Sequence, residues 1–133
     1  MNITLESDYA VRIVDYLAVQ PQKVGAGTIA EVTGVTPRFT LKILHKLVSA
    51  GIVRSYKGAK GGYELARPAA EITLKDVIET VEGPYTFSRC LDPNHSCKCE
   101  NSSCRQGSCR FQRVYDDISD TVRKKLEQVT FER

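Results

Sequence analysis

Apolar side chains recur every three or four residues in the first fifty positions of the chain, in three separate runs. The runs cover residues 4–20, 28–34 and 36–51. Each run opens with a threonine, whose hydroxyl can cap a helix N-terminus, and a glycine closes the second and third. The pattern predicts three amphipathic helices. Thr28 and Glu31 have the spacing of a capping box, so we expect the second helix to begin at Thr28.

The third predicted helix has a basic face as well as an apolar one. Arg38, Lys42 and Lys46 recur at intervals of four residues, away from its apolar positions. Thr36 and Pro37 supply the cap and the proline that commonly open a helix. A short turn separates this helix from the second. Two helices joined in this way, the second basic and facing outward, are typical of a helix-turn-helix.

A β-hairpin is predicted directly after the third helix. Residues 52–56 and 63–66 have strand character and flank a glycine-rich tip that carries Lys57 and Lys60. A basic hairpin in this position is a wing, which places its lysines against phosphates or a minor groove. The other interpretation is a plain hairpin with a solvated tip. The position next to the recognition helix favours the wing.

The second half of the chain contains two further helical patterns and one irregular segment. Residues 73–82 predict a fourth helix, capped by Thr73 and stopped by Gly83. Residues 85–106 show no helical or strand period and predict a long loop. From Arg110 onward, a single apolar stripe predicts a last helix of about five turns. The stripe consists of Phe111, Val114, Ile118, Val122, Leu126 and Val129.

The last helix has two candidate partners, its own domain and a second copy of the chain. We expect a homodimer, because helix-turn-helix proteins commonly pair across two half-sites. The predicted fold is therefore mainly α with a small β-hairpin, a winged helix-turn-helix followed by a long C-terminal dimerisation helix. We expect residues 1–82 to bind DNA, residues 83–109 to form a cysteine-rich cluster-binding loop and residues 110–133 to dimerise.

Positive charge is concentrated in the segment that contains the predicted recognition helix and wing. Residues 36–67 hold seven lysine and arginine side chains against Glu64 alone, a net charge of +6, whereas the whole chain carries +3. Such a field attracts the phosphates of double-stranded DNA, although a solvated basic face would show the same pattern.

The chain has no apolar run of membrane-spanning length and no signal-peptide pattern, so we expect a cytoplasmic protein that binds no membrane.

Five cysteines crowd the segment before the last helix: Cys90, Cys97, Cys99, Cys104 and Cys109. In a reducing cytosol, such a group indicates metal or redox chemistry rather than structural disulfides. Thiolates bind iron-sulfur clusters and zinc, and metal-free redox thiols are a third interpretation of the same spacing. The chain shows no catalytic His-Cys arrangement, so we do not expect an enzyme.

Four motifs stand out along the chain, at residues 7–12, 57–63, 81–84 and 109–120. Together they resemble the family of winged-helix iron-sulfur regulators that includes IscR, NsrR and RirA, and the resemblance covers nearly the whole chain. It implies a transcriptional repressor that senses iron-sulfur status, nitric oxide or redox state through a 2Fe-2S or 4Fe-4S cluster. A zinc-bound or metal-free thiol-redox winged-helix regulator is the alternative.

The resemblance also implies which cysteines hold the cluster. Three cysteines serve as ligands in that family; Cys90 matches the first and Cys109 the last. Three cysteines stand here where the family has one in the middle. Cys104 is the preferred middle ligand, because its spacing from Cys109 is closest to the family's last interval. Cys97 is the second choice and Cys99 the third.

The fourth ligand varies among the relatives that this chain resembles. IscR-like members have a histidine three residues after the last cysteine, and Gln112 stands at that position here. NsrR-like members use an aspartate from the first helix of the partner subunit, and Asp8 matches that position. The resemblance therefore implies Asp8 as a ligand to the partner's cluster. Asp8 has a second explanation, because an acid in the first turn stabilises a helix N-terminus.

The DNA contacts implied by the resemblance lie on the third helix and the wing. Thr36, Pro37 and Arg38 would face bases in the major groove, and Lys42 the DNA backbone. Lys57 stands at the wing position where relatives often have arginine. We expect Lys46 and Lys60 to extend this basic surface toward phosphates.

Overall fold

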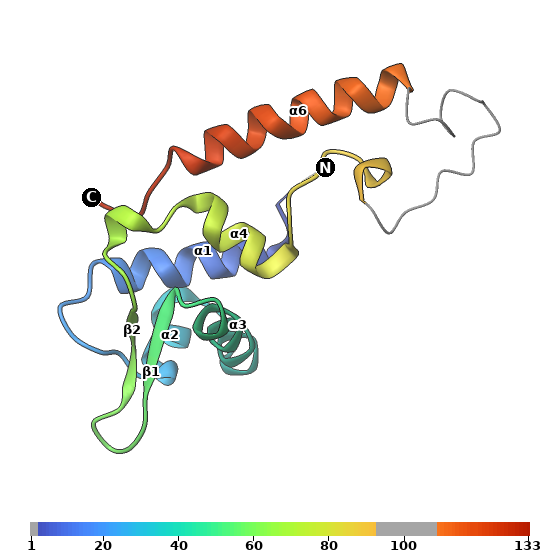
Figure 1. Cartoon of the computed structure of the whole chain (residues 1–133). Helices are drawn as coiled ribbons and strands as arrows, with labels where there is room; N and C mark the ends of the chain where they lie inside the picture. Colours follow the sequence, from blue (N-terminus) through green and yellow to red (C-terminus); the bar gives the residue numbers. More distant parts are fainter. Residues whose placement is uncertain (1–2, 93–108) are drawn as a thin grey trace.

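Helices and one antiparallel hairpin make up the computed structural model of the chain, which describes residues 3–92 and 109–133 (Figure 1). The elements are α1 (Leu5–Ala18), α2 (Ala26–Thr33), α3 (Pro37–Ser49), β1 (Val53–Tyr56), β2 (Gly62–Leu65), the 3-10 turn η1 (Ala69–Glu71), α4 (Leu74–Glu82), the 3-10 turn η2 (Arg89–Leu91) and α6 (Arg110–Glu127). The predicted fold class is confirmed. No helix within the described ranges is both long and apolar enough to cross a membrane.

Local capping explains where α1, α3 and α4 begin. The hydroxyls of Thr4, Thr36 and Thr73 each accept a hydrogen bond from the amide three residues further along. Asp76 completes a capping box at α4 by accepting from the amide of Thr73 at 3.0 Å. Gly34 ends α2 with a φ of 73°, a conformation that glycine adopts without strain. These boundaries confirm the ones predicted from the sequence.

The start of α2 differs from the prediction, which was wrong at this point. The helix begins at Ala26 with Gly25 as its N-cap, and Thr28 lies inside its first turn. Val24 pairs with Tyr63 of the hairpin through two backbone hydrogen bonds of 3.0 and 2.8 Å. Because this pairing holds the chain against the hairpin at Val24, the helix starts immediately afterwards. A long-range contact has outweighed the local capping signal.

The hydrophobic core lies between α1, α3, the hairpin and the start of α4. Most of its central side chains come from the elements that the sequence predicts: Ile13, Val14, Ile43, Leu44, Leu47, Ile52 and Val77. Ile72, just before α4, joins them from outside those elements. Burying each of these side chains contributes roughly 1.5–3 kcal/mol to folding. The core therefore fixes how α3 is rotated, and this rotation determines which of its side chains face outward.

The predicted hairpin forms, with β1 and β2 paired antiparallel, and projects past α2 and α3 (Figure 1). Val53 pairs with Leu65, and Tyr56 pairs with Gly62. The tip of the hairpin is the part of this region furthest from α6 (Figure 1). Lys57 lies at this tip, so the fold presents the charged end of the wing away from the rest of the domain.

Helix α6 packs on α4, and the chain after it returns to the core (Figure 1). The amide of Leu74 donates to the carbonyl of Val129 at 2.8 Å. Two residues later, Phe131 is only 7% exposed and belongs to the core. Phe111 and Val114, by contrast, are 53% and 54% exposed. The domain therefore leaves the N-terminal half of the predicted apolar stripe uncovered.

Candidate nucleic-acid interface and metal centre

The N-terminal end of α3 is an exposed edge of the molecule on a firmly held backbone. Thr36, Pro37 and Arg38 are all exposed. The amide of Phe39 donates to the Thr36 hydroxyl at 3.3 Å, and the Phe39 ring packs edge-on against Tyr9 with centroids 5.6 Å apart. The cap and this packing hold the three exposed residues in place. Recognition of bases in a groove requires such an arrangement.

Two outward-facing side chains of α3 are not among the site residues predicted from the sequence. Leu41 is 52% exposed, and His45 is also exposed. They follow Arg38 by three and seven residues, a spacing that places all three on one side of the helix. An exposed leucine at this place offers an apolar surface to the methyl group of thymine. The apolar period already contained this signal, because Leu41 falls outside the buried face of α3.

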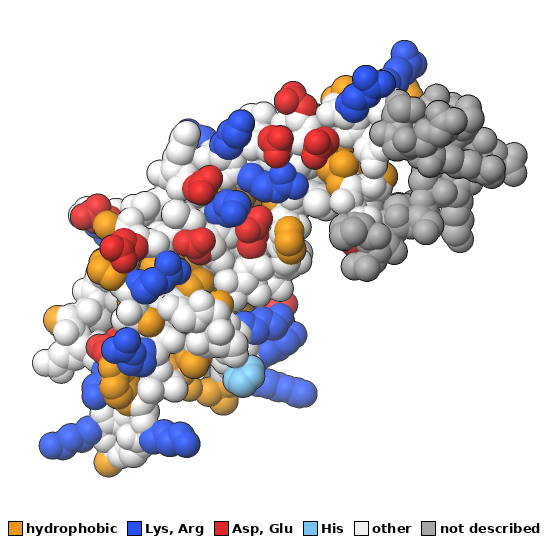
Figure 2. Space-filling model, viewed as in Figure 1, with side chains coloured by type: hydrophobic (Ala, Val, Ile, Leu, Met, Phe, Trp, Pro, Cys, Tyr) orange, Lys and Arg blue, Asp and Glu red, His pale blue; other side chains and the backbone are white. Residues whose placement is uncertain are grey.

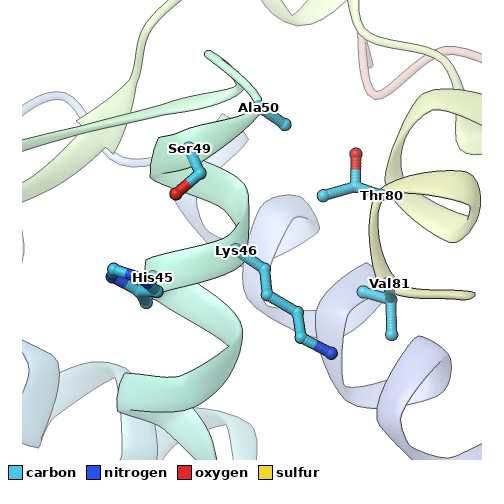
Figure 3. A pocket seen from close by; sticks show the side chains of 6 residues that line it. All are labelled: His45, Lys46, Ser49, Ala50, Thr80 and Val81. Carbon is cyan, nitrogen blue, oxygen red and sulfur yellow. The ribbon is translucent and has the colours of Figure 1, made fainter.

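The fold gives different surroundings to the two lysines of α3. The ammonium of Lys46 lies 2.8 Å from the carboxylate of Glu6 on α1, and that of Lys42 lies 3.8 Å from the same oxygen. The Lys46 side chain is 35% exposed and that of Lys42 is 57% exposed. Lys46 also lines, with His45, a groove of about 400 Å³ between α3 and α4 (Figure 3). Lys42 is therefore the better placed of the two to reach a phosphate.

Further basic side chains surround the wing. Lys57 and Lys60 are exposed at its tip. Where β1 leads into the tip, the ammonium of Lys23 lies 4.1 Å from the centre of the Tyr56 ring, and the Tyr56 hydroxyl donates to Glu64 at 2.5 Å. Lys23 lies in the segment between α1 and α2, so no local sequence pattern connected it with the wing. The structure adds it to the basic surface.

Arg54 adds another positive charge on β1, where it is exposed. A side-chain hydrogen bond and the charge interaction with Tyr56, helped by the nearby Glu64, raise the pKa of its guanidinium. Figure 2 shows Lys and Arg side chains projecting from the wing and from beside α3, whereas Asp and Glu are more frequent over α4 and α6. The charge asymmetry of the sequence is therefore also an asymmetry in space.

Acidic side chains gather at the N-terminal end of α1. Asp8 forms an ion pair with Arg12 at 2.7 Å and has a side chain 47% exposed. Glu82, at the end of α4, accepts from the Ser7 hydroxyl at 2.6 Å and from both the amide and the hydroxyl of Thr4. Partial burial raises the pKa of Glu82, but these hydrogen bonds outweigh it, so the pKa is lowered overall. This cluster joins α4 to α1 beside Asp8.

The first and last cysteines lie on elements that touch. Cys90 belongs to η2 and Cys109 is the N-cap of α6, and both are half-buried. Gln112, in the first turn of α6, donates from Nε2 to the carbonyl of Cys90 at 3.0 Å. This contact brings together the two ends of the cysteine segment. The other candidate ligands lie outside the described residues: Cys97, Cys99 and Cys104.

The two thiols that the structure describes have the chemistry of a thiolate metal site, but a metal site needs more than two ligands. Among residues 3–92 and 109–133, no three His, Cys, Asp or Glu side chains are grouped so that they could hold a metal ion. Two thiols on touching elements are nevertheless the soft donors that iron-sulfur clusters and zinc require.

Comparison with known proteins gives consistent matches. The model of the Rrf2 family, described as "Iron-dependent Transcriptional regulator", matches residues 3–133. Protein aau3 of Rhizobium meliloti (strain 1021) is 39% identical over 93 residues, which are 69% of this chain but only 60% of that protein. A protein of Aquifex aeolicus (strain VF5) is 36% identical over 92% of this chain and 83% of its own length. The regulator NsrR of Shouchella clausii is 27% identical, covering 98% of this chain and 85% of its own.

Solved structures share this fold over nearly the whole chain. IscR of T. potens superposes with a TM-score of 0.74 at 24% identity, covering 98% of this chain and 83% of its own. CymR, described as the global cysteine regulator of B. subtilis, superposes with a TM-score of 0.71 at 26% identity, covering 98% of this chain and 93% of its own. The winged-helix arrangement is confirmed by these matches.

Proposed function

Because the chain belongs to the Rrf2 family of helix-turn-helix transcriptional regulators, we propose that it is a dimeric repressor whose DNA binding is controlled through an iron-sulfur cluster. Proteins of this family are regulators and not enzymes. In this proposal, residues 1–82 bind DNA, residues 83–109 hold the cluster and residues 110–133 form the dimer. The observation that carries the cluster assignment is the contact that places Cys90 beside the start of α6, where Cys109 lies.

DNA recognition in this proposal depends on the outward side of α3. Thr36, Pro37 and Arg38 meet base edges in the major groove, with Arg38 suited to a guanine because its guanidinium can donate two parallel hydrogen bonds. Leu41 contacts a thymine methyl group, and Lys42 reaches the backbone. The two wing lysines bind phosphates beside an adjacent groove. Support comes from the exposure of all these side chains.

Dimerisation in this proposal uses the uncovered face of α6. Phe111 and Val114 are more than half exposed, at 53% and 54%, although they belong to an apolar stripe. A second copy related by a two-fold axis would bury both stripes at once. Two such subunits would bind half-sites about one helical turn apart, roughly 34–36 Å. The spacing of the two recognition helices then depends on how α6 is held.

The cluster in this proposal has Cys90 and Cys109 as two of its ligands. Cys104 supplies the third, ahead of Cys97 and Cys99, and the partner subunit's Asp8 supplies the fourth. A bound cluster would confer sensitivity to nitric oxide, to oxygen and to iron supply. The cysteine segment connects the DNA-binding elements to α6, so its conformation bears on how the two recognition helices are spaced.

A second candidate function is a thiol regulator that holds no iron. It is favoured by the similarity to CymR, whose description names cysteine. In this version the chain responds by forming disulfides among Cys97, Cys99 and Cys104, or its cysteines hold a structural zinc ion. Both versions keep the same DNA-binding surface, so DNA binding alone does not distinguish them.

Metal content decides between these versions. Protein purified without air is expected to contain iron and acid-labile sulfide, to absorb visible light and to lose that absorbance with nitric oxide. Cys90→Ser should abolish the absorbance, and Asp8→Ala should alter the spectrum if Asp8 is a ligand. Protein that contains zinc, or no metal even after reconstitution with iron and sulfide, would refute the cluster and favour the thiol version.

A further inference from the structure

The segment that connects α4 to η2 is held against α6 by side chains of that helix. Nε of Arg123 donates to the carbonyl of Tyr85 at 2.9 Å. Closer to the start of α6, the hydroxyl of Ser119 accepts a hydrogen bond from the amide of Phe87 at 2.7 Å. The connecting segment therefore runs along α6 in the opposite direction to the helix.

Gln112 makes the third contact of this kind, from Nε2 to the carbonyl of Cys90 at 3.0 Å. Gln112, Ser119 and Arg123 are separated by seven and four residues, so they lie on one face of α6. We call these three residues the polar seam. Each contacts a main-chain atom of residues 85–90, so the seam holds the backbone itself.

The polar seam leaves the connecting segment little freedom to slide. Helix α6 rises about 6 Å between Ser119 and Arg123, and two residues of extended chain cover about 7 Å. Between Gln112 and Ser119 the rise is about 10 Å, which three residues barely span. The turn at η2 shortens the distance that these residues span along α6, and the long side chain of Gln112 bridges the difference. Gln112 is thus the seam residue that contacts Cys90 itself.

The middle contact of the seam is well protected. Ser119 is fully buried, whereas most of α6 is exposed. Its hydroxyl donates to the carbonyl of Tyr115 at 2.8 Å while accepting from Phe87, so its hydrogen-bonding capacity is used in both directions. The rings of Phe87 and Tyr115 also pack together, with centroids 5.6 Å apart. The segment is therefore anchored at this point even when the contact at Gln112 is removed.

We propose that Gln112 is a positioning residue for the cysteine site, holding Cys90 in place relative to Cys109. Gln112 follows Cys109 by one helical turn, so its hydrogen bond ties both cysteines to the same end of α6. This inference rests on the proposed function, in which both cysteines bind the cluster. The other seam contacts extend the coupling along α6 toward Arg123.

Alkylation of the metal-free protein tests this role without requiring a cluster. The chain would carry Cys97→Ser, Cys99→Ser and Cys104→Ser, and iodoacetamide labelling of the two remaining cysteines would be followed by peptide mass. Gln112→Leu is expected to speed labelling of Cys90 about fivefold. The variant loses the hydrogen bond to the Cys90 backbone, and the net contribution of one such bond corresponds to a factor of about five. Labelling of Cys109 should not change. Gln112→Met, which keeps the length of the side chain and adds no charge but removes the donor, should speed labelling as Gln112→Leu does.

Two results would overturn the proposal: an unchanged rate at Cys90, or an equal rise at both cysteines, which would indicate general loosening of the end of α6. Gln128→Leu at the other end of the helix is the matched control. In a parallel experiment with the five cysteines intact, a reconstituted cluster should lose its visible absorbance to a chelator about fivefold faster in Gln112→Leu. If the unaltered chain takes up no iron, the proposed function fails, whereas the alkylation result still decides the role of Gln112.

Discussion

The ammonium of Lys46 lies 2.8 Å from the carboxylate of Glu6, although the two residues are 40 positions apart in the sequence. Their side chains are only 35% and 21% exposed. Lys46 thus connects α3 to α1, whereas Lys42 reaches the same carboxylate only at 3.8 Å. The sequence spacing places Lys46 on the basic face of α3, but in the fold it forms an ion pair with Glu6.

This pairing predicts that the two lysines differ when replaced. Lys46→Ala should lower the free energy of unfolding by about 1 kcal/mol, because a partly shielded, charged hydrogen bond is lost. Lys42→Ala should change it by less than about 0.5 kcal/mol. Urea denaturation measures both. On DNA the order should reverse, with the greater loss of affinity for Lys42→Ala. A greater loss for Lys46→Ala would mean that Lys46 leaves Glu6 when DNA binds.

Arg38→Ala should relax the choice of DNA sequence. Loss of contacts to a base edge is expected to weaken operator binding by about 1–3 kcal/mol and to leave random DNA nearly unaffected. Lys60→Ala is the comparison, because losing one phosphate contact should weaken both DNAs alike and reduce the salt slope by about 0.9. Anisotropy titrations at several salt concentrations give both quantities. Equal losses on operator and random DNA for Arg38→Ala would contradict its assignment to bases.

Val114→Glu should weaken the dimer. A carboxylate in the middle of the uncovered apolar face would have to be buried without a partner, which should weaken association more than about tenfold. Asp116→Lys is the control, since residue 116 is exposed and lies on the opposite side of α6. Analytical ultracentrifugation gives the dissociation constants. A Val114→Glu variant that dimerises like the unaltered chain would place the interface elsewhere.

The carboxylate of Glu82 should contribute stability that depends on pH. Partial burial raises its pKa, but hydrogen bonds from Ser7 and Thr4 lower it further, to below the ordinary value of 4.5. A lowered pKa in the folded state means stability that is present above pH 4.5 and is lost as the pH falls through the folded pKa.

Replacing Glu82 with Gln therefore tests this linkage. Glu82→Gln should be less stable than the unaltered chain near neutral pH, and the difference should shrink as the pH falls below 4.5. Urea denaturation between about pH 3 and 6 covers the transition expected for a carboxyl group. Glu127→Gln, at an exposed position of α6, serves as the control. A stability difference that stays constant over this range would argue against the linkage.

Phe131→Ala should destabilise the whole domain. The side chain is 7% exposed in the core, and its amide donates to the carbonyl of Ile72 at 3.2 Å. Removing a buried phenylalanine ring typically costs about 3–5 kcal/mol. Val129→Ala, at a residue 43% exposed, should cost less than about 1 kcal/mol. Chemical denaturation compares the two. A small effect of Phe131→Ala would mean that the C-terminal segment is not part of the cooperative core.

The sequence by itself determined those features that depend on neighbouring residues. The starts of α3 and α4 follow from Thr36 and Thr73, because each cap joins groups three residues apart. The apolar periods fixed which faces of α1, α3 and α4 are buried, and the hairpin followed from strand character around a glycine-rich tip. On these local grounds the winged-helix class and the exposed start of α3 were already predictable.

The tertiary structure decided what depends on residues far apart in the chain. It moved the start of α2 because Val24 pairs with Tyr63, and it paired Lys46 with Glu6. It also brought Gln112 to the carbonyl of Cys90, 22 positions away. Such contacts arise only when the buried faces of α1, α3, α4 and α6 fix the relative positions of the helices. A local pattern records which face is buried, but not which distant side chain it will meet.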